Sequence, residues 1–447
     1  MQPRYVVEPE SAERLAGLLA WASQEHVSLV LRGGGTKLGW GRRGGRIDLL
    51  ASTARLDRVL AHEHGDLTAT VEAGATIGDV NRRLARHGQW LPLQTSFEQA
   101  TVGGTIATNE SGPLRHRHGT PRDLLIGVQL ATTDGRLVKA GGNVVKNVAG
   151  YDLGKLVCGS FGSLAAIVTA TFKLAPLPAA STTLAASFGD RQALVQAVQA
   201  VGASQLEPSA FDLRVAFNPA TAGSHVQPGT QQRVPGEAGA EVQSFSSNVA
   251  AAPPPHVASG FSRTADVQTA DGTVQSKPSY TLLIQFASTP AAIEAQIDVA
   301  RRLCAGAGVE IVTGADEAAR WDEQARRLWN APGMIVRVSW LPAALESLIA
   351  IVERIAAGAA SIELTGRAGV GAGLVRVEAD AAAQVRAVAE LRGQSPIVGH
   401  VVVLRAEQAV KEQADVWGPA GDTAALMRAI KQALDPAAIL NANRGPL

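Results

Sequence analysis

The sequence predicts an α+β protein of two domains, in which a glycine-rich N-terminal domain precedes a domain built on an antiparallel sheet. Three observations support this prediction. The chain has 447 residues, more than one typical domain. Its first part alternates helix and strand patterns around three glycine-rich stretches, and its second part repeats strands and helices in a regular order. We expect domains at 1–178 and 179–430 and a C-terminal tail at 431–447 that returns to the first domain.

Composition excludes several classes of partner. The 41 basic and 40 acidic residues leave a net charge of +1, which gives no electrostatic reason to expect nucleic acid. The two cysteines, Cys158 and Cys304, are too far apart in sequence to form an iron–sulfur motif or a disulfide framework. No stretch approaches the roughly 18 apolar residues of a membrane span. We therefore expect a cytoplasmic protein without an integral membrane segment.

Helix and strand patterns alternate in the N-terminal domain. Apolar residues at positions 15, 18, 19 and 22 predict a helix, and a short strand, Leu29 to Leu31, runs into a triple glycine. Thr76 can begin a further helix that Gly88 ends. Strands are predicted over 66–73, over 126–138 with an Asp134-Gly135 turn, and over 164–174.

The second domain shows a repeated order of strands and helices. Strands are predicted over 183–188, 210–217, 280–286, 309–312, 334–340, 362–364 and 374–377, and helices over 191–201, 291–305 and 345–355. This order favours an antiparallel sheet covered by helices, as in a ferredoxin-like fold. Residues 218–279 are rich in Ala, Gln, Ser, Pro and Gly and lack periodicity, so we predict a flexible low-complexity insertion there.

The first glycine-rich stretch is Gly33 to Gly35. Consecutive glycines allow positive φ and bring backbone N–H groups close to an anion, and a diphosphate is the natural guest. Arg32 before the turn and Thr36 and Lys37 after it add two positive charges and a hydroxyl. A plain loop is the alternative. The spacing fits neither a Walker loop nor a dinucleotide fingerprint, and the later glycines at 369–373 predict a hairpin loop.

Two further stretches follow, one at 101–112 and one at 141–164 that contains the string Lys-Asn-Val-Ala-Gly-Tyr-Asp-Leu from Lys146 to Leu153. In this order and spacing the three stretches resemble the FAD-linked oxidases of the vanillyl-alcohol-oxidase, or PCMH, type, and within them the FAD-binding E subunits of glycolate oxidases. The resemblance covers Val6 to about Pro178, the second domain by its pattern, and the C-terminal region through Trp417 and Arg444. It implies a PCMH-type FAD-binding domain of two subdomains followed by a ferredoxin-like α+β cap.

The resemblance also implies a set of cofactor contacts. The residues expected to bind FAD are Arg32, Gly33, Gly34, Gly35, Thr36, Lys37, Thr95, Ser96, Thr101, Val102, Gly103, Gly104, Thr108, Ser111, Ile167 and Val168, with backbone near Ala166. Relatives that bind flavin covalently have a histidine at the position of Thr36. We therefore expect non-covalent FAD.

As a function, the resemblance implies an FAD-binding subunit of a glycolate oxidase-like complex. Such a complex oxidises a small 2-hydroxy acid, glycolate, to a 2-oxo acid, glyoxylate, and passes electrons through a catalytic FAD-linked D-type subunit and an iron–sulfur subunit. These partners would also place the chain peripherally at the inner membrane. The alternatives are a self-contained FAD-dependent 2-hydroxy-acid or alcohol dehydrogenase and an assembly subunit that has lost flavin.

Oxidation of a 2-hydroxy acid needs a base and a cation for the carboxylate. The candidate catalytic residues are His118 and Lys146; their alternatives are a surface position for His118 and an ion pair with Asp152 for Lys146. His400 fits a half-buried strand residue better than a site residue, and Arg337 fits a flavin-facing or a structural position equally well. The pairs His62-x-His64 and His116-x-His118 have ligand spacing, but no third ligand is apparent, so no metal is predicted.

Overall fold

A computed structural model describes residues 3–42, 47–142, 151–217, 267–268, 274–275, 278–441 and 444–445. The chain divides into two units, one of Met1–Phe217 with Pro278–Leu447 and one of Asn218–Lys277. In the second unit β13 (Val267–Gln268) pairs antiparallel with β14 (Val274–Gln275). The predicted flexible insertion therefore falls almost entirely on residues outside the described ones. Everything below concerns the larger unit.

The N-terminal domain begins with a small parallel sheet. Its strands lie in the order β1 (Tyr5–Val7), β3 (Leu49–Ser52), β2 (Leu29–Arg32). The helix α1 (Ala12–Gln24) packs on this sheet through Leu15, Leu19 and neighbouring apolar residues, as its predicted stripe requires. Ser11 caps α1 by accepting a hydrogen bond from the N–H of Arg14 at 3.2 Å.

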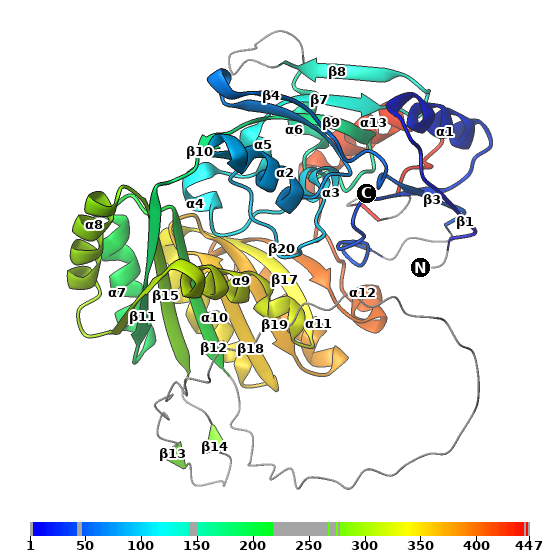
Figure 1. Ribbon diagram of the computed structural model, residues 1–447. Coiled ribbons are helices and arrows are strands. Elements are labelled where there is room, and N and C mark those ends of the chain that lie inside the picture. The colour runs from blue at the N-terminus through cyan, green and yellow to red at the C-terminus, as the bar shows by residue number, and fades with distance from the viewer. Residues whose placement is uncertain are drawn as a thin grey trace, which may run out of the picture. The chain divides into compact units, whose positions relative to one another are not determined.

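A five-stranded antiparallel sheet forms the second part of the N-terminal domain (Figure 1). Its order is β4 (Val59–Glu63), β5 (Thr68–Glu72), β9 (Ala166–Lys173), β7 (Leu125–Ala131), β8 (Leu137–Gly141). The accompanying helices are α2 (Ile77–Leu84), α3 (Val102–Thr108), α4 (Arg115–His118), α5 (Pro121–Leu124) and α6 (Leu153–Val157). Thr76 caps α2 as predicted, accepting from the N–H of Asp79 at 3.0 Å.

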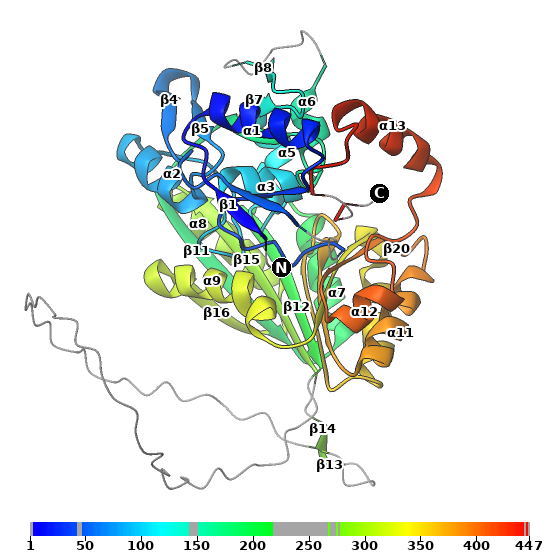
Figure 2. The same cartoon turned by 90° about the vertical axis from the view of Figure 1, so that its right-hand side faces the viewer.

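The cap is one eight-stranded sheet made of two βαββαβ units (Figures 1 and 2). The first unit runs β11 (Ala180–Phe188), α7 (Arg191–Gly202), β12 (Ala210–Phe217), β15 (Ser279–Ser288), α8 (Pro290–Leu303), β16 (Gly308–Thr313). The second runs β17 (Met334–Trp340), α10 (Leu345–Ala356), β18 (Ser361–Arg367), β19 (Ala372–Glu378), α11 (Ala381–Arg392), β20 (Val398–Arg405). Each unit has the strand order 4-1-3-2 of a ferredoxin-like fold, and β12 and β18 join them edge to edge.

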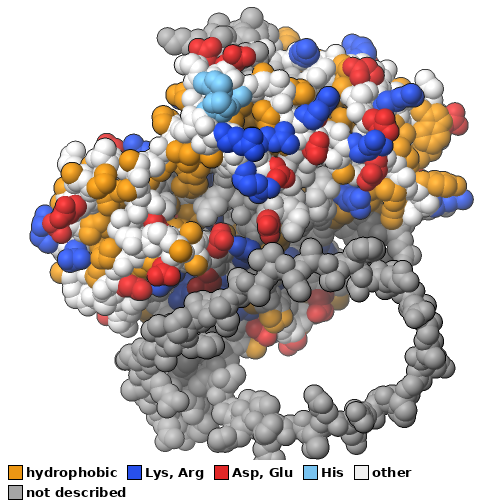
Figure 3. Space-filling model, in the orientation of Figure 1, with side chains coloured by type: hydrophobic (Ala, Val, Ile, Leu, Met, Phe, Trp, Pro, Cys, Tyr) orange, Lys and Arg blue, Asp and Glu red, His pale blue; other side chains and the backbone are white. Residues whose placement is uncertain are grey.

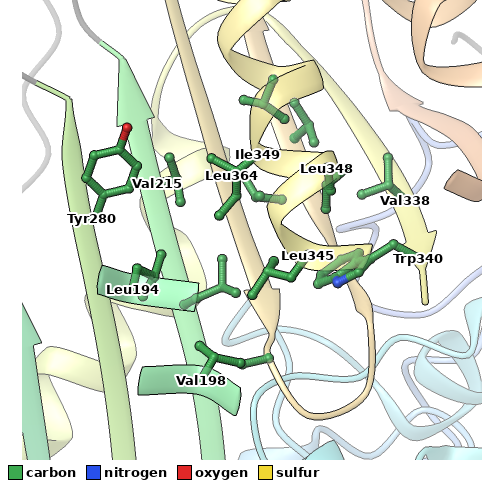
Figure 4. Packing of buried hydrophobic residues seen from close by; sticks show 14 of the residues in the cluster. Leu194, Val198, Val215, Tyr280, Val338, Trp340, Leu345, Leu348, Ile349 and Leu364 are labelled. Atoms are coloured by element: carbon green, nitrogen blue, oxygen red, sulfur yellow. The ribbon is translucent and has the colours of Figure 1, made fainter. Parts of the chain in front are cut away.

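The helices α7, α8, α10 and α11 cover one face of the cap sheet and enclose its main core. Figure 4 shows Leu194 and Val198 of α7 and Leu345 and Leu348 of α10 in one packed cluster with the strand residue Leu364. These side chains are almost fully removed from water, and burial of each contributes about 1.5–3 kcal/mol. The predicted ferredoxin-like pattern is confirmed, although the structure contains two such units rather than one.

The opposite face of the sheet is partly covered by α9 (Gly314–Asn330), which the sequence pattern did not predict. Trp321 packs there against Ala185 and Val312. Because Ala185 lies between Leu184 and Ala186 on β11, its side chain points away from the main core. The rest of this face is turned toward the N-terminal domain, and it contributes to the site described below.

The chain returns to the N-terminal domain after the cap. It passes through α12 (Gln408–Gln413) and α13 (Ala424–Leu434), and Leu440 then bridges to Leu29 of β2 in parallel. Asp435 accepts the N–H groups of Ile439 and Leu440 at 3.1 and 2.9 Å and so shapes the turn that follows α13. The last described residues are thereby placed beside the glycine turn.

Candidate functional site

The triple-glycine turn begins directly after β2 and packs against the segment that precedes α3. A Cβ atom on Gly34 would lie 1.8 Å from the backbone oxygen of Gln99, and one on Gly33 would lie 2.1 Å from Oγ1 of Thr101. Gly35 has a φ of +75°. Only glycine meets these requirements, so the local sequence is dictated by close backbone contact.

The backbone donors of this turn are free to bind an anion. Within the described residues, the N–H groups of positions 33–37 have no hydrogen-bond partner. Arg32 likewise has no carboxylate partner in the described part of the chain. Unpaired backbone donors beside a cation are the arrangement that holds phosphate groups in nucleotide sites. The turn fits a pyrophosphate on these grounds.

A hollow with about 790 Å³ of space free of atoms, part of it open to solvent, lies along this turn. Its lining combines the turn, the start of α3, the beginning of β9 and the C-terminal segment. We call it the turn cavity. The expected cofactor residues that line it are Arg32, Gly33, Gly34, Gly35, Thr36, Lys37, Thr101, Gly103, Gly104, Thr108 and Ile167, together with Ala166.

The remaining expected cofactor residues lie elsewhere. Ser96 and Ser111 line a second cavity. Val102 and Val168 are almost fully buried and pack in the hydrophobic cores, while the hydroxyl of Thr95 donates to the backbone oxygen of Phe97 at 3.0 Å. The stretch at 101–109, predicted to bind the cofactor, forms the helix α3 with Thr101 as its N-cap and Asn109 as its C-cap.

Two C-terminal residues complete the turn cavity. Asn441 and Arg444 both line it, although neither was expected as a cofactor contact. The guanidinium of Arg444 donates to the backbone oxygens of Leu38 and Trp40, and it is almost completely buried. Burial lowers the pKa of Arg444. Arg444 therefore ties the C-terminal segment to the loop that follows the glycine turn.

The second cavity has about 1300 Å³ free of atoms and lies between the N-terminal domain and the cap sheet. Thr108 lines both cavities, so the two adjoin. Three arginines line the second cavity from three different elements: Arg115 of α4, Arg337 of β17 and Arg367 of β18. We call it the arginine cavity. Its other walls include the rings of Trp40 and Trp329, which stack with their centroids 5.1 Å apart. Trp40 belongs to the N-terminal domain and Trp329 to α9, so the two parts meet at this contact.

Positive charge is poorly compensated in the arginine cavity. Burial lowers the pKa of Arg337, and the charge of Arg115 lowers it further. Burial likewise lowers the pKa of Arg115, with a second contribution from Arg367. Among the described residues Arg337 has no ion pair, and Arg367 has only the buried Asp212, with Nε 3.7 Å from Oδ1. A bound anion would relieve this repulsion.

An ion pair stands where the cavities meet. Nζ of Lys37, from the turn cavity, lies 2.6 Å from Oε2 of Glu110, from the arginine cavity, and both side chains are buried. The other oxygen of Glu110 accepts the N–H of Ser96 at 2.9 Å. The positive charge of Lys37 is therefore already balanced by Glu110. Arg32 is the cation of this stretch that lacks a carboxylate partner within the described residues.

The histidines occupy different places from those the sequence favoured. His400 lies on β20 as expected, but its side chain is exposed and lines the arginine cavity rather than being half-buried. His118 lines neither cavity and packs edge-on against Trp90 at 5.8 Å. Burial and the charge of Arg117 lower the pKa of His118. Lys146 lies outside the described residues, so the role predicted for it stays a prediction; Asp152, its alternative partner, pairs with Lys155 at 2.8 Å.

Comparison with known families supports the cofactor. Residues 3–141 match the FAD binding domain family, and residues 417–444 match the C-terminal domain of FAD linked oxidases. The family that these two matches support is that of the FAD-linked oxidases. FAD is the cofactor of this family of oxidoreductases, and the second match contains both Asn441 and Arg444, the C-terminal residues of the turn cavity.

Several curated relatives of this chain are named for 2-hydroxy acids. The chain is 31% identical over 211 residues to glycolate oxidase subunit GlcD of Bacillus subtilis, covering 47% of this chain and 45% of that one. It is 34% identical to the D-lactate dehydrogenase of Archaeoglobus fulgidus over 41% of each chain. Glycolate oxidase subunit GlcE of Escherichia coli is 31% identical over 42% of this chain and 52% of that one. The matches thus span about half the length of these relatives.

A solved structure shares the fold. Alkyldihydroxyacetonephosphate synthase aligns with a TM-score of 0.63 at 16% identity, covering 98% of this chain and 77% of that chain. The likeness confirms the α+β architecture of an FAD-binding domain with a cap. In the part of the chain that the structure describes, no helix is both long and apolar enough to cross a bilayer.

Proposed function

We propose that the chain is an FAD-binding subunit that oxidises a small 2-hydroxy acid to a 2-oxo acid within a glycolate oxidase-like complex. The observation that carries this proposal is the arginine cavity beside the turn cavity. Arg337 and Arg115 offer guanidinium groups without a carboxylate partner among the described residues, and a guanidinium binds a carboxylate through paired hydrogen bonds.

The two cavities would have different roles: the turn cavity would hold FAD, and the arginine cavity would bind the substrate. The backbone donors of 33–37 and the guanidinium of Arg32 would hold the pyrophosphate of FAD. Bound FAD supplies the acceptor for the α-hydrogen and its electron pair. Arg337 and Arg115 would bind the substrate carboxylate and orient the carbon that is oxidised. The hydroxyl proton must pass to a base, and His400 is the imidazole that lines the arginine cavity.

His400 is favoured over Glu110 for this proton. The carboxylate of Glu110 is engaged on both oxygens, by Lys37 and by the N–H of Ser96. The side chain of His400 is exposed, and its ring has no hydrogen-bond partner within the described part of the chain; its backbone N–H donates to Oγ of Ser339 at 2.9 Å. A free ring nitrogen can accept a proton and release it to solvent.

The test uses purified, FAD-loaded protein under anaerobic conditions. Glycolate, D-lactate and D-2-hydroxyglutarate are added in turn, and loss of the visible flavin absorbance is followed. Each acid is compared with its methyl ester, which keeps the hydroxyl and removes the carboxylate charge. We expect bleaching by at least one acid and none by its ester. Equal bleaching by acid and ester would contradict a role for the arginines in substrate binding.

The partners need a second experiment. We expect a catalytic FAD-linked subunit and an iron–sulfur subunit to co-purify with this chain from its native host, and to be required for electron transfer to the physiological acceptor. A self-contained dehydrogenase is the second candidate, favoured by the presence of the arginine cavity and His400 in this one chain. Isolation of the chain without partners, together with full turnover with a natural acceptor, would decide for this second candidate.

A further inference from the structure

Three histidines meet at the outer end of the five-stranded sheet, away from both cavities. His62 lies on β4, His64 begins the short 3-10 helix η1 (His64–Asp66), and His87 ends a second one, η2 (Ala85–His87), after α2. One ring nitrogen of each histidine lies within 4.8 Å of one ring nitrogen of each of the others. Figure 3 shows histidine side chains gathered in one patch over this end of the molecule.

From this cluster we propose a binding site for one Zn²⁺ or similar divalent transition-metal ion, with His62, His64 and His87 as ligands. The sequence alone offers only the first pair, because His87 lies on a different element. The fold supplies the third ligand. Three imidazoles without a thiolate suit Zn²⁺, Ni²⁺ or Cu²⁺ and are poor ligands for Ca²⁺ or Mg²⁺, which prefer oxygen.

The buried side chain of Gln89 prepares His62 for this role. Nε2 of Gln89 donates to the backbone oxygen of His64 at 2.9 Å, which can only accept, so the amide orientation is determined. Oε1 of Gln89 then faces Nε2 of His62 at 2.8 Å, and that ring nitrogen must carry the proton. Nδ1 of His62 keeps its lone pair. A ligand histidine whose other nitrogen donates to a carbonyl oxygen is the usual arrangement in metal sites.

The backbone that presents the histidines is well anchored. The turn after His64 closes through Leu67, which has a φ of 52° and pairs its N–H with the oxygen of His64. The segment after His87 is held by Gly88, whose backbone oxygen accepts the N–H of Leu177 at 2.8 Å. Gln89 connects the two segments. The site thus joins the β4–β5 hairpin to the end of α2, and a bound ion would crosslink these elements.

Only side-chain movement is needed to close the site. Metal–nitrogen bonds of about 2.0–2.1 Å at tetrahedral angles place the nitrogens roughly 3.4 Å apart. The rings of His64 and His87 are stacked at 3.9 Å and would have to swing apart, while His62 and His64 already meet edge-on at 4.2 Å. Both His64 and His87 are exposed, so their rings can rotate and solvent can fill a fourth position.

The proposal is tested on the full-length, FAD-loaded chain produced without a histidine tag. Co²⁺ is added as a spectroscopic probe, and Zn²⁺ affinity is measured by competition with a chromophoric chelator. We expect one ion per chain and a melting temperature that rises until one equivalent is bound. Failure of the unaltered protein to bind either ion at micromolar concentrations would overturn the proposal.

Matched variants locate the ion. His64→Asn with His87→Asn is expected to lower Zn²⁺ affinity by at least about 100-fold, and Gln89→Ala by about 10- to 100-fold. His26→Asn is the control, since His26 is exposed, stands outside the cluster and has a φ of 53°, which asparagine tolerates. Flavin content reports folding in every variant. Unchanged affinity in a flavin-loaded double variant would contradict the assignment, as would an equal loss in His26→Asn.

Discussion

Lys37 and Glu110 form a buried ion pair with 2.6 Å between Nζ and Oε2, at the point where the turn cavity meets the arginine cavity. The pair joins the glycine turn to the segment that follows α3. It therefore holds together the two segments that separate the cavities. Two buried charges of opposite sign are stable only together, because removal of one leaves the other desolvated and unpaired.

Breaking this pair should destabilise the protein. Glu110→Gln leaves Lys37 buried without a counter-charge and is expected to lower the free energy of unfolding by about 3–5 kcal/mol. The double variant Lys37→Met with Glu110→Leu removes both charges and should lose much less. Denaturant titration of the flavin-free proteins measures both values. If the losses of Lys37→Met and Glu110→Leu, each measured as a single variant, simply added up in the double variant, the pair would not be energetically coupled.

Replacement of Gly34 by valine should abolish FAD binding. The added Cβ would lie 1.8 Å from the backbone oxygen of Gln99, so the turn must move away from the segment before α3. Gly39→Val is the matched control, because a Cβ at Gly39 meets no atom within 4 Å. The ratio of flavin to protein absorbance after gentle purification measures the effect. Normal flavin content in Gly34→Val would show that the turn is not part of the FAD-binding site.

Loss of the guanidinium at position 337 should lower kcat/KM for the 2-hydroxy acid. Arg337→Met keeps much of the side-chain volume and removes the charge-assisted hydrogen bonds to a carboxylate, each worth about 1.5–3 kcal/mol, or about a 10- to 150-fold fall in kcat/KM. Arg301→Met on the exposed side of α8 provides the control. Steady-state kinetics on the acid identified above gives both values. Equal kinetics in the two variants would place the carboxylate elsewhere.

The stability of the cap should depend on pH through Asp212. Burial raises the pKa of Asp212 from 3.8 to about 6, against the opposing effects of Arg367 and Gln324. Because the folded state holds the proton more tightly than the unfolded state, this contribution is complete below about pH 4 and is lost as the pH rises through about 6. A difference of about two units corresponds to roughly 3 kcal/mol.

Asp212→Asn tests this dependence. The free energy of unfolding of the unaltered protein, minus that of the variant, should fall by roughly 2.5 kcal/mol between pH 4 and pH 7. Asp298→Asn, at an exposed position on α8, controls for general charge effects. A difference that stays constant over this range would mean that Asp212 does not change its protonation there.

The apolar patterns of the sequence predicted most of the fold. The strands β12 and β17 have the bounds that alternation indicated, and α10 extends one residue beyond its predicted end. The helix α9 escaped prediction because its buried face alternates apolar residues with the polar Glu317 and Gln324. Glu317 accepts hydrogen bonds from Ser181 and Thr183 there, at 2.6 and 2.7 Å, so no apolar stripe marks that face.

The site was predicted where its residues are adjacent in sequence and was missed where they are not. The glycine turn could be predicted because close backbone contacts and a positive φ require glycine at consecutive positions. The arginine cavity brings together Arg115 and Arg337, which lie on different domains, and isolated arginines carry no sequence signal of their own. His87 and Gln89 were missed for the same reason, since they reach the β4 hairpin through tertiary packing and the side-chain hydrogen bonds of Gln89.

Asn441 and Arg444 line the turn cavity although the whole cap precedes them in the chain. During synthesis the glycine turn therefore leaves the ribosome long before the residues that complete the wall of the turn cavity. The nascent N-terminal domain cannot complete the wall of the turn cavity until the cap has been synthesised and the last segment has docked. If FAD binds in the turn cavity, as proposed above, its retention should depend on the folding of both domains. A cap variant that folds poorly should then be purified with little flavin as well as low stability.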